Sequence, residues 1–331
     1  MSIPETMRAW RVTELGEPAQ ALSLEDVAVP EPASDEALVR IRAVAANFPD
    51  VLLCRGQYQV RPELPFVPGV EFVGELVSGE VAGVGVGARV VGSKIGVLSE
   101  YATLPAADVW AAPETLDDAS ASGLTVAYQT AWFGLHRRAA LRSGEWVLVH
   151  AAAGGVGLAA AQIAAAAGAH VIGVVGTEAK VAVARDSGCE VVVVRGRDDI
   201  AAVVREATGG RGADVVFDPV GGEAFTVSTK CIAFEGRIVV VGFAGGEIQT
   251  LPAGHVLVKN YTVLGLHWGL YPSVRPDLVD QAREEITALA DAGAIHPVVD
   301  RVVPFEQTPE ALTALASGAT IGRVVIELTS S

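Results

Sequence analysis

The stretch of sequence that decides the fold is residues 146–157, WVLVHAAAGGVG. Its first half is a continuous apolar run typical of a buried strand, and its second half is a glycine-rich turn that opens a helix. Gly154 lets the backbone approach a pyrophosphate, and Gly157 lets the helix pack close to the strand. Gly155 and Val156 lie at the helix start, where free N–H groups attract an anion. The segment therefore predicts a dinucleotide site rather than a merely structural turn.

Outside this stretch, apolar runs alternate with helical patterns from residue 123 onward. Val- and Ile-rich runs without a polar face are typical of strands in a parallel sheet that is covered by helices on both faces. The predicted class is therefore α/β, with a doubly wound parallel sheet. We expect strands at residues 146–150, 170–175, 190–194, 214–218, 237–241 and 261–266, and helices at residues 155–167, 178–187, 198–208 and 223–234.

Two further regions flank this pattern. Before residue 122, short β-like runs separated by Pro and Gly indicate an irregular, mainly β domain. After the sixth predicted strand, a tail of two helices and two strands is expected to return to that first domain. We therefore divide the chain into residues 1–122, 123–266 and 267–331. The expected elements are strands at residues 37–44, 71–77, 88–91, 102–104, 298–303 and 323–328, and helices at residues 277–292 and 308–317.

The end of the second predicted strand indicates which dinucleotide is bound. Sites for NAD usually place an acidic residue there, where its carboxylate binds the ribose 2′-hydroxyl. Here the strand ends at Val175, and Gly176 and Thr177 follow. The hydroxyl of Thr177 and the cation of Lys180 suit a 2′-phosphate, so the sequence favours NADPH over NADH. Against this, Glu178 adds a carboxylate nearby, and Lys180 is also explained as a solvated helix residue.

Composition excludes several classes of protein. The 331 residues carry 24 Lys and Arg against 39 Asp and Glu, a net charge of −15, and 50% of them are hydrophobic. The hydrophobicity excludes intrinsic disorder, and the charge opposes binding to nucleic acid. Glycines interrupt the most apolar segment, residues 151–176, so we expect a buried helix there rather than a membrane span. The first residues form no apolar signal region, and the three scattered cysteines suggest no disulfide framework, which favours the cytoplasm.

Four segments carry a resemblance to a known family. They are residues 47–58 (NFPDVLLCRGQY), residues 65–74 (PFVPGVEFVG), the glycine turn together with residues 175–180 (VGTEAK), and residues 214–222 (DVVFDPVGG) with 236–242 (GRIVVVG). In this order they make the chain similar to the zinc-independent quinone oxidoreductases of the medium-chain dehydrogenase/reductase superfamily. The resemblance spans essentially the whole chain.

The resemblance implies a GroES-like, β-rich catalytic domain built from both chain ends, with a Rossmann domain inserted and the active site in the cleft between them. It also implies a homodimer joined through the last strand of the Rossmann sheet. Two positions depart from the family pattern. Val194 stands where a Tyr often borders the NADPH site, and the adjacent Arg195 offers an alternative partner for adenine or phosphate. Leu52 stands where some members carry a second Tyr in the active-site loop.

No metal is expected. Zinc-dependent relatives carry a Cys in the active-site loop and a His before the acidic residue of the Gly-x-Glu segment, and here these places hold residues 47–50 and Val70. The clustered cysteines of the structural zinc site are also missing from the sequence, since residues 79–121 contain no Cys. A catalytic zinc usually takes three protein ligands, and the six histidines are scattered without ligand spacing.

A nicotinamide site without a metal suits acceptors that are already electrophilic, such as a quinone or an enone. The protein then orients the cofactor, excludes water and donates hydrogen bonds to the developing oxyanion. Tyr58 is the best candidate donor, with a packed core Tyr as the alternative. Asn47 and Asp50 complete the candidate catalytic group, where they shape the loop and contact the ribose or amide of the nicotinamide.

Further contacts to the cofactor are expected near the ends of strands. The resemblance implies that the Thr125 hydroxyl contacts the nicotinamide side of the cofactor, and a helix N-cap is its alternative role. Ligands bind beyond the carboxyl ends of strands in such sheets, so backbone contacts to the carboxamide are expected after the fifth and sixth predicted strands. The residues concerned are Gly242 and Phe243, and Leu266, His267 and Trp268.

The favoured function is thus an NADPH-dependent reductase that transfers a hydride to a small quinone-type acceptor. A reductase of enones, which reduces an activated C=C bond, uses the same site chemistry and is the first alternative. A nucleotide-binding protein with little turnover is the second.

Overall fold

The computed structural model describes residues 3–328. Contacts between Cα atoms divide the chain into two compact units. The first, here called the β-rich unit, comprises Met1–Val126 and His296–Ser331, and the second, the parallel-sheet unit, comprises Ala127–Ile295. Residues 267–295 therefore group with the parallel-sheet unit, whereas the sequence division assigned them to the returning tail.

A seven-stranded sheet forms the centre of the β-rich unit, with β6 paired to β3 beside the path β14-β15-β3-β4-β5-β7. The tail returns here as expected, because β15 pairs antiparallel with β3 and places Val325 opposite Ala45. The strands are β1 (Thr6–Val12) and β2 (Leu22–Ala28), which pair with each other, β3 (Glu36–Ala45), β4 (Glu71–Ser78), β5 (Arg89–Ser93), β6 (Tyr101–Pro105), β7 (Val109–Ala111), β14 (Val299–Pro304) and β15 (Arg323–Glu327).

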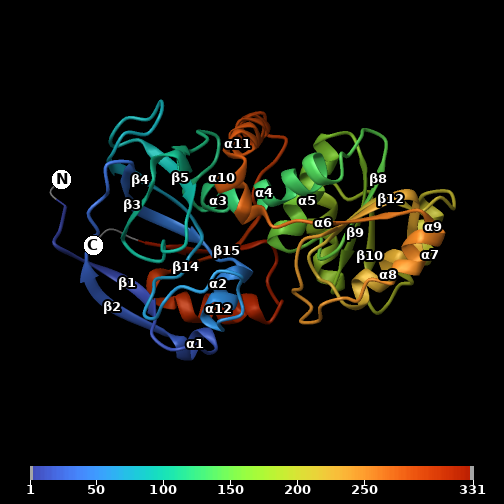
Figure 1. Ribbon diagram of the computed structural model, residues 1–331, viewed down its shortest axis with the longest axis horizontal. Helices are drawn as coiled ribbons and strands as arrows, with labels where there is room; N and C mark the ends of the chain where they lie inside the picture. The colour runs from blue at the N-terminus through green and yellow to red at the C-terminus, as the bar shows by residue number, and fades with distance from the viewer. Residues whose placement is uncertain (1–2, 329–331) are drawn as a thin grey trace. The chain divides into compact units, whose positions relative to one another are not determined.

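Short helices complete this unit around a core that includes Phe72, Leu98 and Phe305. Helix α2 (Phe48–Cys54) packs against α12 (Thr308–Ala316), so segments from the two ends of the chain lie side by side (Figure 1). The other helices are α1 (Pro18–Ala21) and α3 (Asp118–Ser122), with 3₁₀ turns at Ala106–Asp108 and Phe305–Gln307.

A buried ionic network, here called the Glu71–Arg323 network, joins β4 to β15. The Arg323 guanidinium pairs with the Glu71 carboxylate, and their side chains are only 7% and 0% exposed. Arg323 Nη1 also donates to Asn47 Oδ1 at 2.9 Å, and Asn47 Nδ2 donates to Glu71 Oε1 at 2.8 Å. Glu71 Oε2 accepts the backbone N–H of Val126 at 2.7 Å. Burial lowers the pKa of Arg323 to about 10, so its guanidinium stays charged at neutral pH.

The parallel-sheet unit contains six strands in the order β10-β9-β8-β11-β12-β13, and neighbouring strands pair in parallel. Helices α5 and α6 lie on one side of these strands and α7, α8 and α9 on the other (Figure 1). This is the doubly wound sheet that the sequence predicts. The strands are β8 (Trp146–Val149), β9 (His170–Val175), β10 (Val191–Val194), β11 (Ala213–Asp218), β12 (Ile232–Val240) and β13 (Thr262–Gly265).

The helices expected between the strands of this unit are present, and two of them differ in extent. Residues 178–180 form a 3₁₀ turn before α6, where one helix was expected. Helix α8 ends early and β12 begins at Ile232, because Ala213 pairs with Ile232 before the register shifts between Ala213 and Val215. The helices are α4 (Thr125–Trp132), α5 (Gly155–Ala166), α6 (Val181–Asp186), α7 (Ile200–Ala207), α8 (Glu223–Cys231), α9 (Ala253–Lys259), α10 (Tyr271–Val274) and α11 (Pro276–Asp291), with a π-helix at Phe133–Arg138 and a 3₁₀ turn at Trp268–Leu270.

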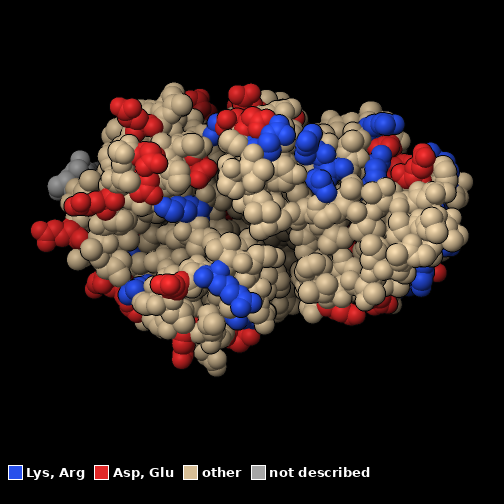
Figure 2. All heavy atoms as spheres, in the orientation of Figure 1, with Lys and Arg blue, Asp and Glu red and all other residues tan. Residues whose placement is uncertain are grey.

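The apolar segment at residues 151–176 lies inside this unit. Helix α5 is buried from Gly157 to Ala164, as expected for a helix that covers a sheet. Within residues 3–328, no helix is long and apolar enough to cross a membrane. On the face drawn in Figure 2, acidic and basic side chains are interspersed between wide uncharged areas, in keeping with a chain that is only 19% charged.

Removal of the cation from the Glu71–Arg323 network should destabilise the β-rich unit. Arg323→Ala leaves the Glu71 carboxylate buried without its partner, and we expect the free energy of unfolding to fall by about 3–5 kcal/mol. The matched control is Arg275→Ala, whose guanidinium pairs with the exposed Asp277, and here we expect a loss below about 1 kcal/mol. Urea denaturation measures both, and equal small losses would contradict the assigned role.

Candidate functional site

The glycine turn between β8 and α5 has the geometry of an anion cradle. Ala151 adopts a φ of 52°, which turns the chain after the strand, and the N–H of Gly154 donates to the Ala151 carbonyl at 2.9 Å. Gly154 then caps α5 with extended backbone, at φ −92° and ψ 167°. The N–H groups of Gly155, Val156 and Gly157 have no acceptor within the helix, because a first turn never supplies one. They are available to a phosphate.

Gly157 admits no side chain. A Cβ atom at this position would lie 2.1 Å from the Ala151 carbonyl oxygen, whereas a Cβ at Gly154 would lie 3.4 Å from the same oxygen. The first glycine of the usual dinucleotide pattern is replaced by Ala152, and β9 accommodates the change. A Cβ at Gly173 would lie 2.9 Å from the Ala152 methyl group, so the missing side chain of Gly173 makes room for it.

The strand order reverses between β8 and β11, and ligands bind at such switch points. At the end of β11, Asp218 is fully buried, and its Oδ1 accepts the N–H groups of Val220 at 2.9 Å and Gly221 at 3.0 Å. Its Oδ2 has no hydrogen-bond partner among the described residues. At the end of β8, the ring of His150 is buried and its Nε2 lies 2.8 Å from Ser228 Oγ.

Burial lowers the pKa of His150, and the charge of Asp218 opposes that shift. The sequence analysis did not include either residue in the site. The available signal was a polar side chain at the carboxyl end of a buried strand, directly beside the glycine turn or its neighbour in the sheet. His150 and Asp218 are thus two buried polar side chains at the ends of β8 and β11, the strands that flank the switch point.

The residues predicted to bind a 2′-phosphate follow the ends of β9 and β10. Gly176 and Thr177 are exposed, and Thr177 begins the 3₁₀ turn that contains Lys180, which is half-buried. The N–H of Arg195 donates to the Val175 carbonyl at 2.8 Å, which holds the end of β10 beside β9. A Cβ at Gly176 would lie 3.9 Å from Arg195 Nη2, so the exposed guanidinium lies beside this glycine.

Arg197 is a neighbour of this group that the sequence analysis missed. Its guanidinium pairs with Glu178 and also donates to Asp198, with Nε–Oδ1 and Nη2–Oδ2 distances of 2.8 and 2.9 Å. Asp198 in turn accepts the N–H of Val194 at 2.8 Å, and the hydrogen bond from Arg197 lowers the pKa of Asp198 to about 2. Two arginines within three residues of a strand end were the signal in the sequence.

The residues predicted to contact the carboxamide follow β12 and β13. The Phe243 side chain is 38% exposed, and the next residue is fixed because Ala244 N–H donates to the Pro219 carbonyl at 3.0 Å. Leu266 is buried and continues the β12–β13 ladder by one hydrogen bond to Val240 at 3.0 Å. Trp268 is half-buried, and its Nε1 donates to Gln129 Oε1 at 3.2 Å. Gly242 and the exposed His267 complete these two segments, and their contact with a cofactor stays a prediction.

In the β-rich unit, Asn47 and Asp50 hold the start of α2. They form a capping box, in which Asp50 Oδ2 accepts the Asn47 N–H at 2.8 Å, and Asp50 Oδ1 accepts the Gly69 N–H at 3.1 Å. The Asn47 amide donates to Ala45 O and Glu71, so both of its hydrogens are used inside the protein. Burial raises the pKa of Asp50 to about 7. These contacts favour the loop-shaping role for both residues.

Tyr58 and Thr125 keep polar groups without a protein partner. The Tyr58 ring is half-buried, and within residues 3–328 its hydroxyl makes no hydrogen bond. Burial, and then the charge of Asp50, raise the pKa of Tyr58, so the phenol keeps its proton. Thr125 opens α4 and is 1% exposed, and its Oγ1 is likewise unpartnered within residues 3–328. The alternative role of Thr125, a side-chain N-cap bond, is therefore not formed.

Side chains that could bind a metal ion do not cluster in the part of the chain that the structure describes. No group of three or more His, Cys, Asp and Glu side chains in residues 3–328 is arranged to hold a metal ion. Cys54, Cys189 and Cys231 are all free and buried, and burial raises the pKa of each thiol to about 12, 12 and 11.

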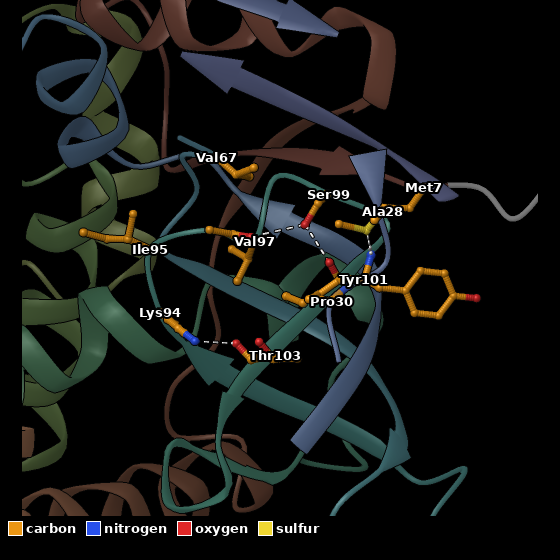
Figure 3. Close-up of a pocket in the computed structure, with 12 residues that line it drawn as sticks. Met7, Ala28, Pro30, Val67, Lys94, Ile95, Val97, Ser99, Tyr101 and Thr103 are labelled. Atoms are coloured by element: carbon orange, nitrogen blue, oxygen red, sulfur yellow. Dashed lines mark hydrogen bonds between the residues drawn. The ribbon is translucent and has the colours of Figure 1, made fainter. Parts of the chain in front are cut away.

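Figure 3 shows a hollow of about 270 Å³ in the β-rich unit, with Met7, Ile95 and Tyr101 among the residues that line it. Lys94 points into it, but its ammonium group is already engaged, with Nζ 2.6 Å from the Thr103 carbonyl and 3.3 Å from Glu36 Oε1. None of the predicted site residues belongs to the described lining. The hollow is separate from the candidate site.

Comparison with known proteins identifies both units. Residues 33–114 match the alcohol dehydrogenase GroES-like domain, and residues 155–288 match the zinc-binding dehydrogenase family. The quinone oxidoreductase-like protein 2 homolog of Nematostella vectensis is 36% identical over 97% of this chain and 89% of its own length.

Two solved structures share the fold throughout. A probable oxidoreductase from Mycobacterium abscessus is 34% identical, with a TM-score of 0.88 over 98% of this chain and 100% of that one. A mycobacterial protein solved in complex with NADPH is 30% identical, with a TM-score of 0.90 over 97% of this chain and 99% of its own. The predicted resemblance and fold class are confirmed. The chain belongs to the quinone-oxidoreductase-like oxidoreductases of the medium-chain dehydrogenase/reductase superfamily.

Proposed function

We propose that this protein is an NADPH-dependent oxidoreductase that transfers a hydride to a quinone-type acceptor without a metal. The observation that carries the proposal is the glycine turn at the switch point of the sheet. There, Gly157 leaves no space for a side chain, and the first turn of α5 has unpaired N–H groups. Such a turn binds the pyrophosphate of a dinucleotide.

The described residues fit a nicotinamide dinucleotide. The turn at residues 154–157 would hold the pyrophosphate, and the segments at Gly242 and Leu266 would offer backbone groups to the carboxamide. In the β-rich unit, the buried and unpartnered Thr125 hydroxyl is a further polar group that fits the nicotinamide side. When bound in its reduced form, this cofactor supplies a hydride. The chain's own residues orient it and exclude water around it.

The preference for NADPH rests on the end of β9. No carboxylate stands at the strand end itself. The Arg195 guanidinium lies beside Gly176, and Thr177 and Lys180 follow within the next four residues of the chain. This arrangement suits a 2′-phosphate better than a free 2′-hydroxyl. The mycobacterial relative solved with NADPH supports the same choice.

For the acceptor, we propose an electrophilic small molecule of the quinone type. The places of the zinc ligands in zinc-dependent relatives hold Val70 and the loop at residues 47–50, so the reaction calls for an acceptor that needs no Lewis acid. Tyr58 would donate its free phenol hydrogen to the oxygen on which negative charge develops. The same phenol would serve an enone, so an enone reductase is the first alternative function. A nucleotide-binding protein with little turnover is the second alternative.

We also propose a homodimer and a cytoplasmic location. Strand β13 is the edge of the six-stranded sheet, and an unpaired edge is a template for pairing with another chain. Nearby in sequence, Leu257 and Val258 of α9 are 77% and 79% exposed, as residues of a covered interface would be in one isolated chain. The three free cysteines suit a reducing compartment.

Purified protein mixed with NADPH and a panel of quinones, enones and 2-substituted acrylates should oxidise the cofactor. We expect turnover to be fastest with a quinone, measured as loss of the absorbance of the reduced cofactor. Faster turnover with an enone would favour the first alternative. No oxidation with any acceptor, together with measurable NADPH binding, would favour the nucleotide-binding protein.

Two glycine variants separate cofactor contact from folding. Gly157→Ala forces the new methyl group against the Ala151 carbonyl, and we expect a loss of about 2 kcal/mol of stability together with weak NADPH binding. In Gly154→Ala the methyl group finds space in the protein but faces the pyrophosphate. We expect stability to change by less than about 1 kcal/mol. NADPH binding should nevertheless weaken at least about tenfold, because the backbone no longer approaches the anion. Calorimetry measures both quantities, and unchanged binding in Gly154→Ala would argue against the pyrophosphate position.

Tyr58→Phe tests the hydrogen-bond donor. Because the phenol makes no hydrogen bond to a described residue, its removal should leave the melting temperature within about 2 °C of the parent. If Tyr58 stabilises the developing oxyanion, kcat falls by about 10²-fold with little change in the KM for NADPH. A parent-like kcat would assign Tyr58 to packing.

A further inference from the structure

We propose that Arg197 is a specificity-determining positioning residue, which masks the Glu178 carboxylate so that a dinucleotide with a 2′-phosphate is accepted. This inference rests on the proposed NADPH site and deepens it. Arg197 lies outside the predicted phosphate-binding group, and it acts through Glu178 rather than on the ligand.

The position of Glu178 makes masking necessary. Glu178 follows Thr177 directly, three residues beyond the end of β9, where the ribose of a bound dinucleotide is expected. A phosphate monoester carries a charge of about −1.5 to −2 at pH 7, so a free carboxylate at this place would repel it. The side chain of Glu178 is 71% exposed, and within residues 3–328 its only ion-pair partner is Arg197.

The structure holds Arg197 in place for this role. Asp198 receives two hydrogen bonds from the guanidinium, at 2.8 and 2.9 Å, and the Val194 N–H fixes Asp198 at 2.8 Å. The remaining guanidinium nitrogen, Nη1, reaches Glu178. The single positive charge of Arg197 is therefore shared between two carboxylates and offsets part of the charge of each. The guanidinium of Arg195 is exposed beside Gly176, where a 2′-phosphate is expected.

The expected effect is on binding and not on folding. The pair is exposed on both sides, at 56% and 71%, and exposed pairs contribute little to stability. The positive charge of Arg197 would nevertheless act on a 2′-phosphate bound nearby. Salt screens that effect, because the Debye length shrinks from about 10 Å at 0.1 M to about 3 Å at 1 M.

The experiment measures the dissociation constants of NADPH and NADH by calorimetry on the full-length protein at low salt. We expect Arg197→Ala to weaken NADPH binding about fivefold while NADH binding changes less than about 1.5-fold, because only NADPH carries the extra charge. Arg197→Lys should stay close to the parent. Arg275→Ala, which removes another exposed arginine (45% against 56% for Arg197) from a different ion pair, is the matched control.

The double variant Glu178→Gln/Arg197→Ala decides the mechanism. If Arg197 acts by masking, removal of the carboxylate restores NADPH binding to within about twofold of the parent, and the loss in Arg197→Ala shrinks at high salt. No restoration would overturn masking and make Arg197 a direct phosphate ligand. Equal losses for NADPH and NADH would also overturn it, since they indicate a structural role.

Failure of the proposed cofactor has a separate signature. If the parent protein binds NADH at least as tightly as NADPH, the NADPH assignment fails. Masking is still judged by the ratio of the two dissociation constants, which Arg197→Ala must shift toward NADH for the inference to stand.

Discussion

A carboxylate and a guanidinium buried together hold the β-rich unit in one arrangement. Glu71 and Arg323 are far apart in sequence, and each loses its hydration on folding, so each must find its partner. The pairing fixes β15, from the end of the chain, against strands from its beginning. It also holds the Asn47 amide on one side and the Val126 backbone on the other. The candidate residues of this unit therefore depend on an interaction in which they take only a secondary part.

The parallel-sheet unit follows from local pattern to a large extent. Its apolar runs, glycine turn and helices could be predicted because burial on both faces of a parallel sheet leaves a plain signal in the sequence. The junction of α8 and β12 could not, since it depends on a register shift between β11 and β12 that no local propensity encodes. The same holds for residues 267–295, whose place in the parallel-sheet unit is set by tertiary contacts.

The candidate site shows the same division. Sequence spacing identifies which residues lie near the ends of strands, and in the structure the Arg195 guanidinium lies beside Gly176. Sequence spacing does not reveal which of these polar groups already have hydrogen-bond partners within the protein. Asn47 and Asp50 prove to be engaged in the start of α2, whereas the hydroxyls of Tyr58 and Thr125 have no hydrogen-bond partner in the described part of the chain. Ion pairs on the surface are not evident from the sequence either. The pair between Arg197 and Glu178 depends on how the loop after β10 lies against the loop after β9.

The exchange between Ala152 and Gly173 sets an order on how this corner of the protein can change during evolution. The methyl group of Ala152 lies in the space that a side chain at position 173 would need. Cys189 limits the same space, because its Sγ is 2.6 Å from where a Cβ at Gly173 would lie. Loss of the methyl at position 152 only opens a small void, while gain of one at position 173 is blocked until both neighbours shrink. A lineage with glycine at position 152 would therefore gain freedom at position 173 only after residue 189 had also become smaller, and a chain with alanine at position 152 is committed to glycine at position 173.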